Sequence, residues 1–186
     1  VDGSGWVYVD EGWAPDSAVQ EAVAEVDGVP VRPQYDLYVM SQCPYGIPAL
    51  AEFTAFVQRF PSVQWDVWFI GTVDDTGGLE SLHGAQEVAE EKLWLAVEAC
   101  YPRRYRPFLQ ARGEERGTTA QLIDQLDMQR DSLEAWVAAH GTRELAMHYR
   151  RSQRLGVRAS PTVTVDNVPV DEPVEFMRLA RTACAR

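Results

Sequence analysis

The sequence predicts an α/β fold, in which a small mixed β-sheet is flanked by helices and the chain between its strands carries an α-helical insertion. Two observations predict it. A strand, a helix and a second strand follow one another over residues 35–71, and a helical crossover makes two such strands parallel. After a long stretch of helical spacing, a strand, a tight turn and a short partner strand follow over residues 161–170, which indicates an antiparallel hairpin.

Residues 1–34 are expected to form an N-terminal extension. The string WVYV at 6–9 is typical of a short strand, and 14–26 has helical spacing with start signals from Pro15 to Ser17. The string Asp-Gly-Val-Pro then ends this helix. The sheet is therefore expected to begin after the extension.

The core of the fold is predicted to comprise residues 35–71 and 157–186. The string YDLYVM at 35–40 has the aromatic and β-branched content of a strand. Apolar residues then recur at helical spacing over 47–60. Residues 62–70 alternate and then become apolar, which predicts a second, largely buried strand.

The intervening residues 72–156 are predicted to form the helical insertion. Helical spacing, broken at Pro and Gly, places its helices at 85–101, 103–111, 118–128, 131–139 and 142–156. The chain then returns to the core. The elements predicted there are a strand at 161–165, a turn at 166–167, a short strand at 168–170 and a helix at 172–184.

Composition limits the classes of function. A chain of 186 residues with 46% hydrophobic residues suits one domain with a sizeable core. The net charge of −11 argues against binding to nucleic acid or to an anionic membrane surface, and solubility explains this charge without a partner. No run of 18 apolar residues is present, so no transmembrane segment is expected. Three cysteines are too few for a disulfide scaffold.

The string MSQCPYG at 40–46 begins as a two-cysteine redox site begins, but its fourth position holds Gly46 in place of a second cysteine. Pro44 suits the first position of a helix, which places Cys43 at or beside the N-cap. Free backbone N–H groups and the helix dipole favour an anion there, so Cys43 is expected to form thiolate, the attacking species in disulfide exchange. The alternative is a small buried cysteine that falls in a loop.

The string RASPTVTV at 158–165 gives a second signal. A proline directly before a strand, here Pro161, is a candidate for a cis peptide bond in a turn, where backbone groups stand beside a reactive cysteine and pair with an extended substrate. The alternative is an ordinary trans proline that begins a strand.

Together these strings resemble the thioredoxin-fold superfamily, in particular the DsbA-type disulfide oxidoreductases, which carry a helical insertion. The resemblance implies that Cys43 is the nucleophile. It also implies a substrate groove formed by Pro44, Tyr45, Gly46, Ser160, Pro161 and Thr162. The implied partners are protein or small-molecule thiols and disulfides, with glutathione as one candidate. The resemblance implies an extracytoplasmic location, periplasmic or at the cell surface, and neither a cofactor nor a metal is expected.

Residues 81–100 are also similar to the signature of gamma-interferon-inducible lysosomal thiol reductase. The residues that match this signature are His83, Gly84, Glu87, Glu98, Ala99 and Cys100. Ser81 and Val88 stand where the signature has cysteines, and Leu37 stands where thioredoxin keeps a buried carboxylate. The nucleophile and the proline thus remain, while the groups that handle protons and close a disulfide are reduced in number.

The other candidate residues have simpler explanations. Cys100 lies on an apolar stripe and is expected to be a buried structural thiol, and Cys184 is expected to be a partly exposed thiol in the last helix. Neither is expected to form a disulfide with Cys43. His148 is expected to be a hydrogen-bonded interior histidine, and helix capping explains His83. No cysteine–histidine spacing resembles a zinc site.

Two functions from different classes remain open. In the first, the protein is a single-thiol oxidoreductase: Cys43 forms mixed disulfides, and a second thiol from glutathione, a partner or a distant cysteine releases them. In this case replacing Gly46 with cysteine is expected to restore a tethered second thiol. In the second, the fold is a redox-inactive module that binds an extended peptide beside Cys43 and Pro161. Exposure and reactivity of the Cys43 thiol distinguish the two.

Overall fold

The computed structural model describes residues 33–61, 63–173 and Met177, together with the backbone of four short strands before residue 33. These strands are β1 (Trp6–Val9), β2 (Gly12–Pro15), β3 (Ala24–Val26) and β4 (Val29–Val31). β1 pairs with β2 and β3 pairs with β4, both in antiparallel orientation. The strand predicted at 6–9 is therefore confirmed.

The helix predicted at 14–26 is wrong, because β2 extends to Pro15 and β3 occupies the last three residues of that range. Two residues separate β3 from β4 in the sequence, Asp27 and Gly28, and Asp-Gly is a pair that favours tight connections between antiparallel strands. This local signal outweighs helical spacing. The helix predicted at 172–184 lies mostly outside the described residues, of which Pro173 and Met177 are helical.

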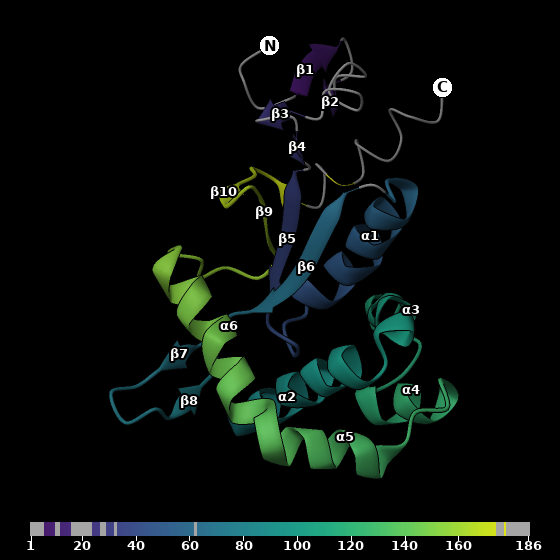
Figure 1. The fold of residues 1–186 in the computed structure, drawn as a ribbon, viewed down its shortest axis with the longest axis vertical. Helices are drawn as coiled ribbons and strands as arrows, with labels where there is room; N and C mark the ends of the chain where they lie inside the picture. The colour runs from purple at the N-terminus through teal and green to yellow at the C-terminus, as the bar shows by residue number, and fades with distance from the viewer. Residues whose placement is uncertain are drawn as a thin grey trace.

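The central sheet has four strands in the order β10–β9–β5–β6 (Figure 1). Their bounds are β5 (Gln34–Val39), β6 (Gln64–Phe69), β9 (Thr162–Val165) and β10 (Val168–Pro169). β5 and β6 run parallel, whereas β9 runs antiparallel to β5, and β10 runs antiparallel to β9. The predicted mixed sheet is confirmed, and α1 (Gly46–Arg59) is the helical crossover between its parallel strands.

The chain between β6 and β9 is mostly helical. Its elements are β7 (Thr72–Val73), β8 (Leu79–Glu80), α2 (Ala85–Cys100), α3 (Pro102–Gly113), α4 (Thr119–Gln125), α5 (Arg130–Trp136), a π-helical turn (Val137–Gly141) and α6 (Thr142–Arg154). The β7–β8 hairpin replaces a predicted loop, since two residues per strand are too few to show a strand pattern. The π-helical turn joins α5 to α6 without a break, where the sequence predicts two separate helices.

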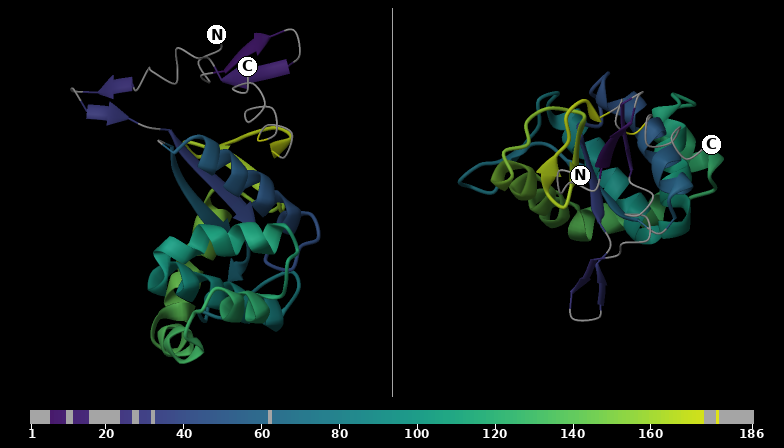
Figure 2. Two further views of the ribbon diagram at one scale, coloured as in Figure 1. Left: turned by 90° about the vertical axis from the view of Figure 1, so that its right-hand side faces the viewer. Right: turned by 90° about the horizontal axis from the view of Figure 1, so that it is seen from above.

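Successive side chains of β5 face opposite sides of the sheet, as the pleat requires. Leu37 and Val39 lie in the main hydrophobic core. Tyr38 and Met40 lie in a smaller cluster, which also contains Cys43. Helices α1 and α6 accordingly cover opposite faces of the sheet (Figure 2).

The insertion and the sheet share the main core. Trp94 of α2 is fully buried and meets the ring of Phe69 of β6 edge to face, with ring centroids 5.8 Å apart. At the end of α3, a Cβ on Gly113 would lie 2.2 Å from the backbone nitrogen of Ala51, so only glycine permits this close approach to α1. The insertion is thus packed as part of the same body, and its boundaries at residues 72 and 156 stay a prediction.

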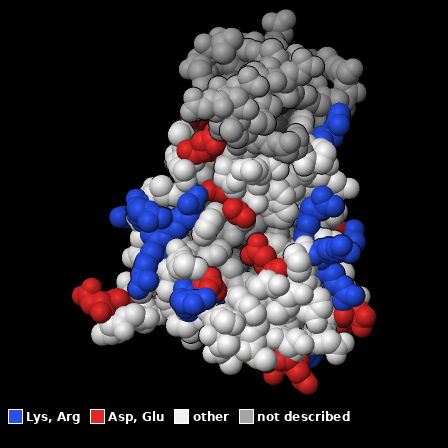
Figure 3. All heavy atoms as spheres, in the orientation of Figure 1, with Lys and Arg blue, Asp and Glu red and all other residues white. Residues whose placement is uncertain are grey.

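Charged side chains are unevenly distributed over the surface. On the face drawn in Figure 3, basic side chains gather over α6 on one flank and over α3 on the other, with acidic side chains between them. This face therefore carries no continuous basic surface. Among the described residues, no helix combines the length and the apolar composition needed to span a bilayer.

Candidate functional site

Cys43 lies in the turn that connects β5 to α1. Its N–H donates to the Met40 carbonyl oxygen at 3.0 Å, and its own carbonyl oxygen accepts from the Ile47 N–H at 3.0 Å. Helix α1 begins at Gly46, so the start predicted at Pro44 is two residues early. The carbonyl of Cys43 nevertheless accepts the bond that an N-cap carbonyl accepts, which places the thiol beside the first turn of α1.

The turn before β9 lies against this cysteine, although the two segments are 117 residues apart in sequence. The peptide bond between Ser160 and Pro161 is cis. The Cys43 Sγ lies 3.5 Å from the Ser160 carbonyl oxygen, to which it donates. The Ser160 Oγ accepts from the Met40 N–H at 3.0 Å. The fold therefore brings the two sequence motifs into direct contact.

The residues of the predicted groove differ in exposure. The Cys43 side chain is buried, with a relative exposure of 8%, whereas Tyr45 is 76% exposed. Gly46 is buried beneath the turn, and the Thr162 Oγ1 donates to the Ala159 carbonyl oxygen at 2.7 Å. A substrate that reaches the Cys43 sulfur must therefore seat itself between the exposed tyrosine and the turn at Pro161, or displace part of this turn.

Two buried glutamates of α2 hold the backbone of the cysteine turn. The Glu87 Oε1 accepts from the Gln42 N–H at 2.7 Å. The Glu91 Oε1 accepts from the Ser41 N–H at 3.3 Å. Both carboxyl groups have no exposed surface. The insertion thus positions the two residues that immediately precede Cys43.

Further donors surround these two carboxyl groups. Glu87 also accepts from Ser81 Oγ, and the His83 Nδ1 lies 2.9 and 3.0 Å from its two oxygens. The Glu91 Oε2 accepts from the Tyr149 hydroxyl at 2.6 Å. Burial raises the pKa of Glu91 to about 9, against the lowering effect of the Tyr149 hydrogen bond. At neutral pH Glu91 is therefore a protonated acid directly behind the cysteine turn.

The sequence singled out Glu87 only through the lysosomal reductase signature, and it missed Glu91. The two glutamates are separated by four residues, which places them on one face of α2. Two acidic residues on the buried face of a helix are a signal of buried hydrogen-bond partners. Their partners in the turn lie 45 and 50 residues away, so local patterns do not identify them.

Other candidate residues lie away from Cys43 or differ from expectation. Cys100 is half-buried, and burial raises the pKa of its thiol. Cys43 and Cys100 are both free thiols, and Cys184 lies outside the described residues. Within the described ranges, no three side chains of the metal-binding kinds gather at one place.

Two expectations about histidines are wrong. His148 packs against the rings of Trp68 and Phe69, with centroids 4.5 and 5.5 Å away. Its Nδ1 is buried without a hydrogen-bond partner, and burial lowers the pKa of its imidazole to about 4, so ring packing takes the place of the expected hydrogen bond. His83 does not cap α2, because its side chain turns to Glu87 instead.

Comparison with known proteins supports the fold. No protein-family model matches the sequence, and no curated protein is significantly similar to it in sequence. A thioredoxin-like oxidoreductase from Silicibacter pomeroyi aligns with a TM-score of 0.59 at 18% identity, over 83% of this chain and 87% of that one. BdbD from Bacillus subtilis aligns with a TM-score of 0.60 at 10% identity, over 81% and 88%. DsbA from Pseudomonas aeruginosa aligns with a TM-score of 0.56 at 12% identity, over 85% and 88%.

The chain has the DsbA-like thioredoxin fold. The helical insertion is included in the similarity, since the aligned part covers more than four fifths of this chain in each case. The similarity to the lysosomal reductase signature stays a prediction. At these identities the structures establish the fold, and the chemistry has to be argued from the residues around Cys43.

Proposed function

We propose that the protein is a thiol–disulfide exchange protein that uses Cys43 as its one reactive thiol. The observation that supports this is the contact between the Cys43 sulfur and the Ser160 carbonyl, at the C-terminal end of β5 and beside the first turn of α1. This arrangement joins a nucleophile to a partly exposed backbone turn in which an extended substrate can pair. Pro44, Tyr45 and Gly46 on one side, and Ser160, Pro161 and Thr162 on the other, form the proposed groove.

The proposed reaction consists of two exchange steps. The Cys43 thiolate attacks one sulfur of a substrate disulfide, forms a mixed disulfide with it and releases the other sulfur as a thiolate. A second thiol, such as glutathione, then attacks the substrate sulfur of the mixed disulfide and releases Cys43 as thiolate. The substrate disulfide is thereby reduced to one thiol and one glutathione adduct, and Cys43 returns to its starting state.

The second candidate function is a peptide-binding module without turnover. The burial of Cys43 favours it, because a thiol that is 8% exposed is poorly accessible to a disulfide in solution. The exposed ring of Tyr45 is available to bind a peptide in either case. Thiol reactivity therefore decides between the two functions.

The test compares the parent protein with Cys43→Ser and with Cys100→Ser as the matched control. Reduction of a small aromatic disulfide is followed in the presence of glutathione, and mixed disulfides are detected by mass spectrometry. We expect the parent and Cys100→Ser to be active and to form an adduct on Cys43, and Cys43→Ser to be inactive. If the parent is no more active than Cys43→Ser and forms no adduct, the peptide-binding function is supported instead.

The proposed function also has consequences for the partners and the location of the protein. The proposed partners are protein or small-molecule thiols and disulfides. The DsbA-like fold supports an extracytoplasmic location, where disulfides persist. We also propose that residues 72–156 act as a unit that supports the cysteine turn, since Glu87 and Glu91 belong to this segment.

A further inference from the structure

Gly46 is the position at which a two-cysteine site would hold its second thiol, and in this protein the space beside it is occupied. A Cβ added to Gly46 would lie 2.3 Å from the Ser160 Oγ. The next nearest atoms, the Cys43 Cβ and the Met40 carbonyl oxygen, would each lie 3.5 Å away, which is ordinary contact. The Ser160 hydroxyl is therefore the one close obstacle to a side chain at position 46 among the described residues.

The Ser160 hydroxyl is also held where it is. It accepts a hydrogen bond from the Met40 N–H at 3.0 Å, and Met40 is buried. Rotating the hydroxyl away from position 46 would leave this buried donor without its partner, which is unfavourable. A side chain at position 46 thus either collides with Ser160 or breaks the bond that fixes the end of β5.

We infer that Ser160 determines the one-thiol character of this site, because its hydroxyl occupies the space that any side chain at position 46 requires. Gly46 and Ser160 act as a matched pair. The second cysteine is not merely replaced by glycine: its place is filled from the opposite side of the groove. Ser160 is in this sense a positioning residue, which acts through the turn at Met40 and Gly46.

The inference changes what is needed to restore a second thiol. A Cβ at position 46 would stand 3.5 Å from the Cys43 Cβ, a separation compatible with a disulfide. The backbone at Gly46 is helical and does not require glycine. The expectation that Gly46→Cys alone suffices is therefore revised: Ser160→Ala is needed as well, because it removes the colliding oxygen.

The stability test uses Gly46→Ala, which adds only the Cβ, in two backgrounds. In the parent background we expect Gly46→Ala to lower the Tm by about 5 °C, because the new methyl group meets the Ser160 hydroxyl. In the Ser160→Ala background we expect the same change to raise the Tm by about 2 °C, because alanine is then favoured over glycine in the helix. The sign of the effect therefore reverses.

A control substitution at a distant position checks that the reversal is specific to Ser160. Ser132 is exposed on α5, so Gly46→Ala should have the same effect with and without Ser132→Ala. If Gly46→Ala in the parent folds too poorly to measure, the comparison of Ser160→Ala with the double variant still tests the sign. A Tm that falls in the Ser160→Ala background, or that rises in the parent, overturns the inference.

A second measurement relates the pair of Gly46 and Ser160 to disulfide exchange, and this measurement rests on the proposed function. With Gly46→Cys and Ser160→Ala combined, oxidised glutathione should close a disulfide between Cys43 and Cys at position 46, releasing two reduced glutathione molecules. Disulfide reduction with dithiothreitol as the donor, without glutathione, should then exceed that of Gly46→Cys alone by about tenfold, which corresponds to about 1.4 kcal/mol. Equal activity of the single and double variants contradicts the inference. If the sign reversal is observed and no variant is active, only the proposed function fails.

Discussion

Asp36 of β5 and Glu91 of α2 are both fully buried carboxyl groups that accept a hydrogen bond from a side chain of α6, yet their surroundings differ. Arg151 of α6 donates to the Asp36 Oδ2 at 2.6 Å. Tyr149, two residues earlier on α6, donates to the Glu91 Oε2 at 2.6 Å. One carboxyl group thus faces a guanidinium and the other faces a neutral hydroxyl.

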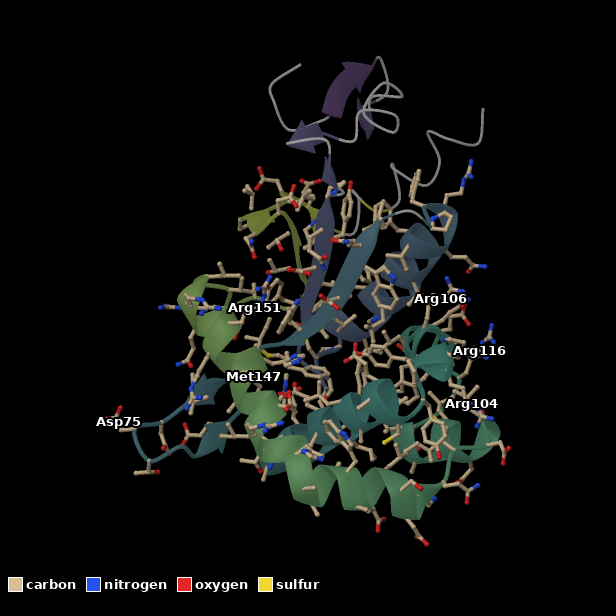
Figure 4. All side chains as sticks on the ribbon, viewed as in Figure 1. Asp75, Arg104, Arg106, Arg116, Met147 and Arg151 are labelled. Carbon is tan, nitrogen blue, oxygen red and sulfur yellow. The ribbon has the colours of Figure 1, made fainter. Side chains whose placement is uncertain are left out.

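The surroundings of Asp36 balance its charge. Arg151 lies over the ring of Trp68 at 4.3 Å and also donates to the Tyr38 hydroxyl at 2.9 Å. Figure 4 shows that Arg151 comes from α6 beside the strands of the sheet. Around Glu91, no lysine or arginine of the described residues lies at ion-pair distance, which is why burial leaves this carboxyl group protonated. The comparison teaches that a cation accompanies Asp36 in the interior, whereas a proton neutralises Glu91 there.

The largest expected effect comes from removing the cation at Asp36. Arg151→Met leaves the Asp36 carboxylate buried without its cation, so we expect the free energy of unfolding to fall by about 3 kcal/mol. This figure allows for the Arg151 side chain, which is 22% exposed. Urea denaturation at pH 7 measures the change.

Arg154→Met is the matched control, since Arg154 is exposed on the same helix. We expect it to change stability by less than about 0.5 kcal/mol. Similar losses for the two variants would show that Asp36 does not depend on its partner. The difference between Asp36 and Glu91 would then have no energetic basis.

A smaller effect is expected from Glu87, which holds the cysteine turn together with Glu91. Glu87→Ala leaves the Gln42 N–H without its acceptor and releases Ser81, so we expect a loss of about 2 kcal/mol. We also expect faster alkylation of Cys43, because the turn that shields its sulfur opens more often. Gln86→Ala, at an exposed position of α2, should alter neither quantity. A slower alkylation of Cys43 in Glu87→Ala would show that the turn does not shield the thiol.

The sheet and most of the helices could be predicted because their residues repeat with the period of the element. The strand at 35–40 and the helix at 85–101 are found within one residue at each end. The contact between Cys43 and Ser160 joins two motifs that local patterns identify separately, and the fold supplies their proximity.

The features of the site that the sequence does not predict depend on contacts between residues far apart in the chain. Glu91 matters because α2 crosses behind the cysteine turn, and the helix itself shows only a glutamate on a buried face. The collision at position 46 depends on the separation of 2.3 Å between an added Cβ and the Ser160 Oγ on the other side of the groove. No spacing in the sequence encodes it. The helical pattern predicts a hydrogen bond for His148, but two aromatic rings pack against its imidazole instead.

The smallest expected effect is the pH dependence of Glu91. Its pKa is raised from 4.5 to about 9 in the folded protein, so between these values the folded state binds a proton that the unfolded state has lost. Stability from this group is therefore fully present below pH 4.5 and falls as the pH rises toward 9. Glutamine resembles the protonated acid at every pH, so Glu91→Gln removes this slope.

We expect Glu91→Gln to gain stability relative to the parent by about 1 kcal/mol between pH 5 and pH 6, as measured by urea denaturation at each pH. Glu98, whose pKa burial raises to about 7, and His148, whose pKa is about 4, also titrate near this range. Both groups are present in parent and variant, so the difference between the two proteins isolates Glu91. Glu134→Gln, at an exposed position of α5, should leave the parent's pH dependence unchanged. A difference that does not vary with pH would mean that Glu91 is charged in the folded protein. The donors in the cysteine turn and Tyr149 would then stabilise its charge as effectively as the guanidinium of Arg151 stabilises Asp36.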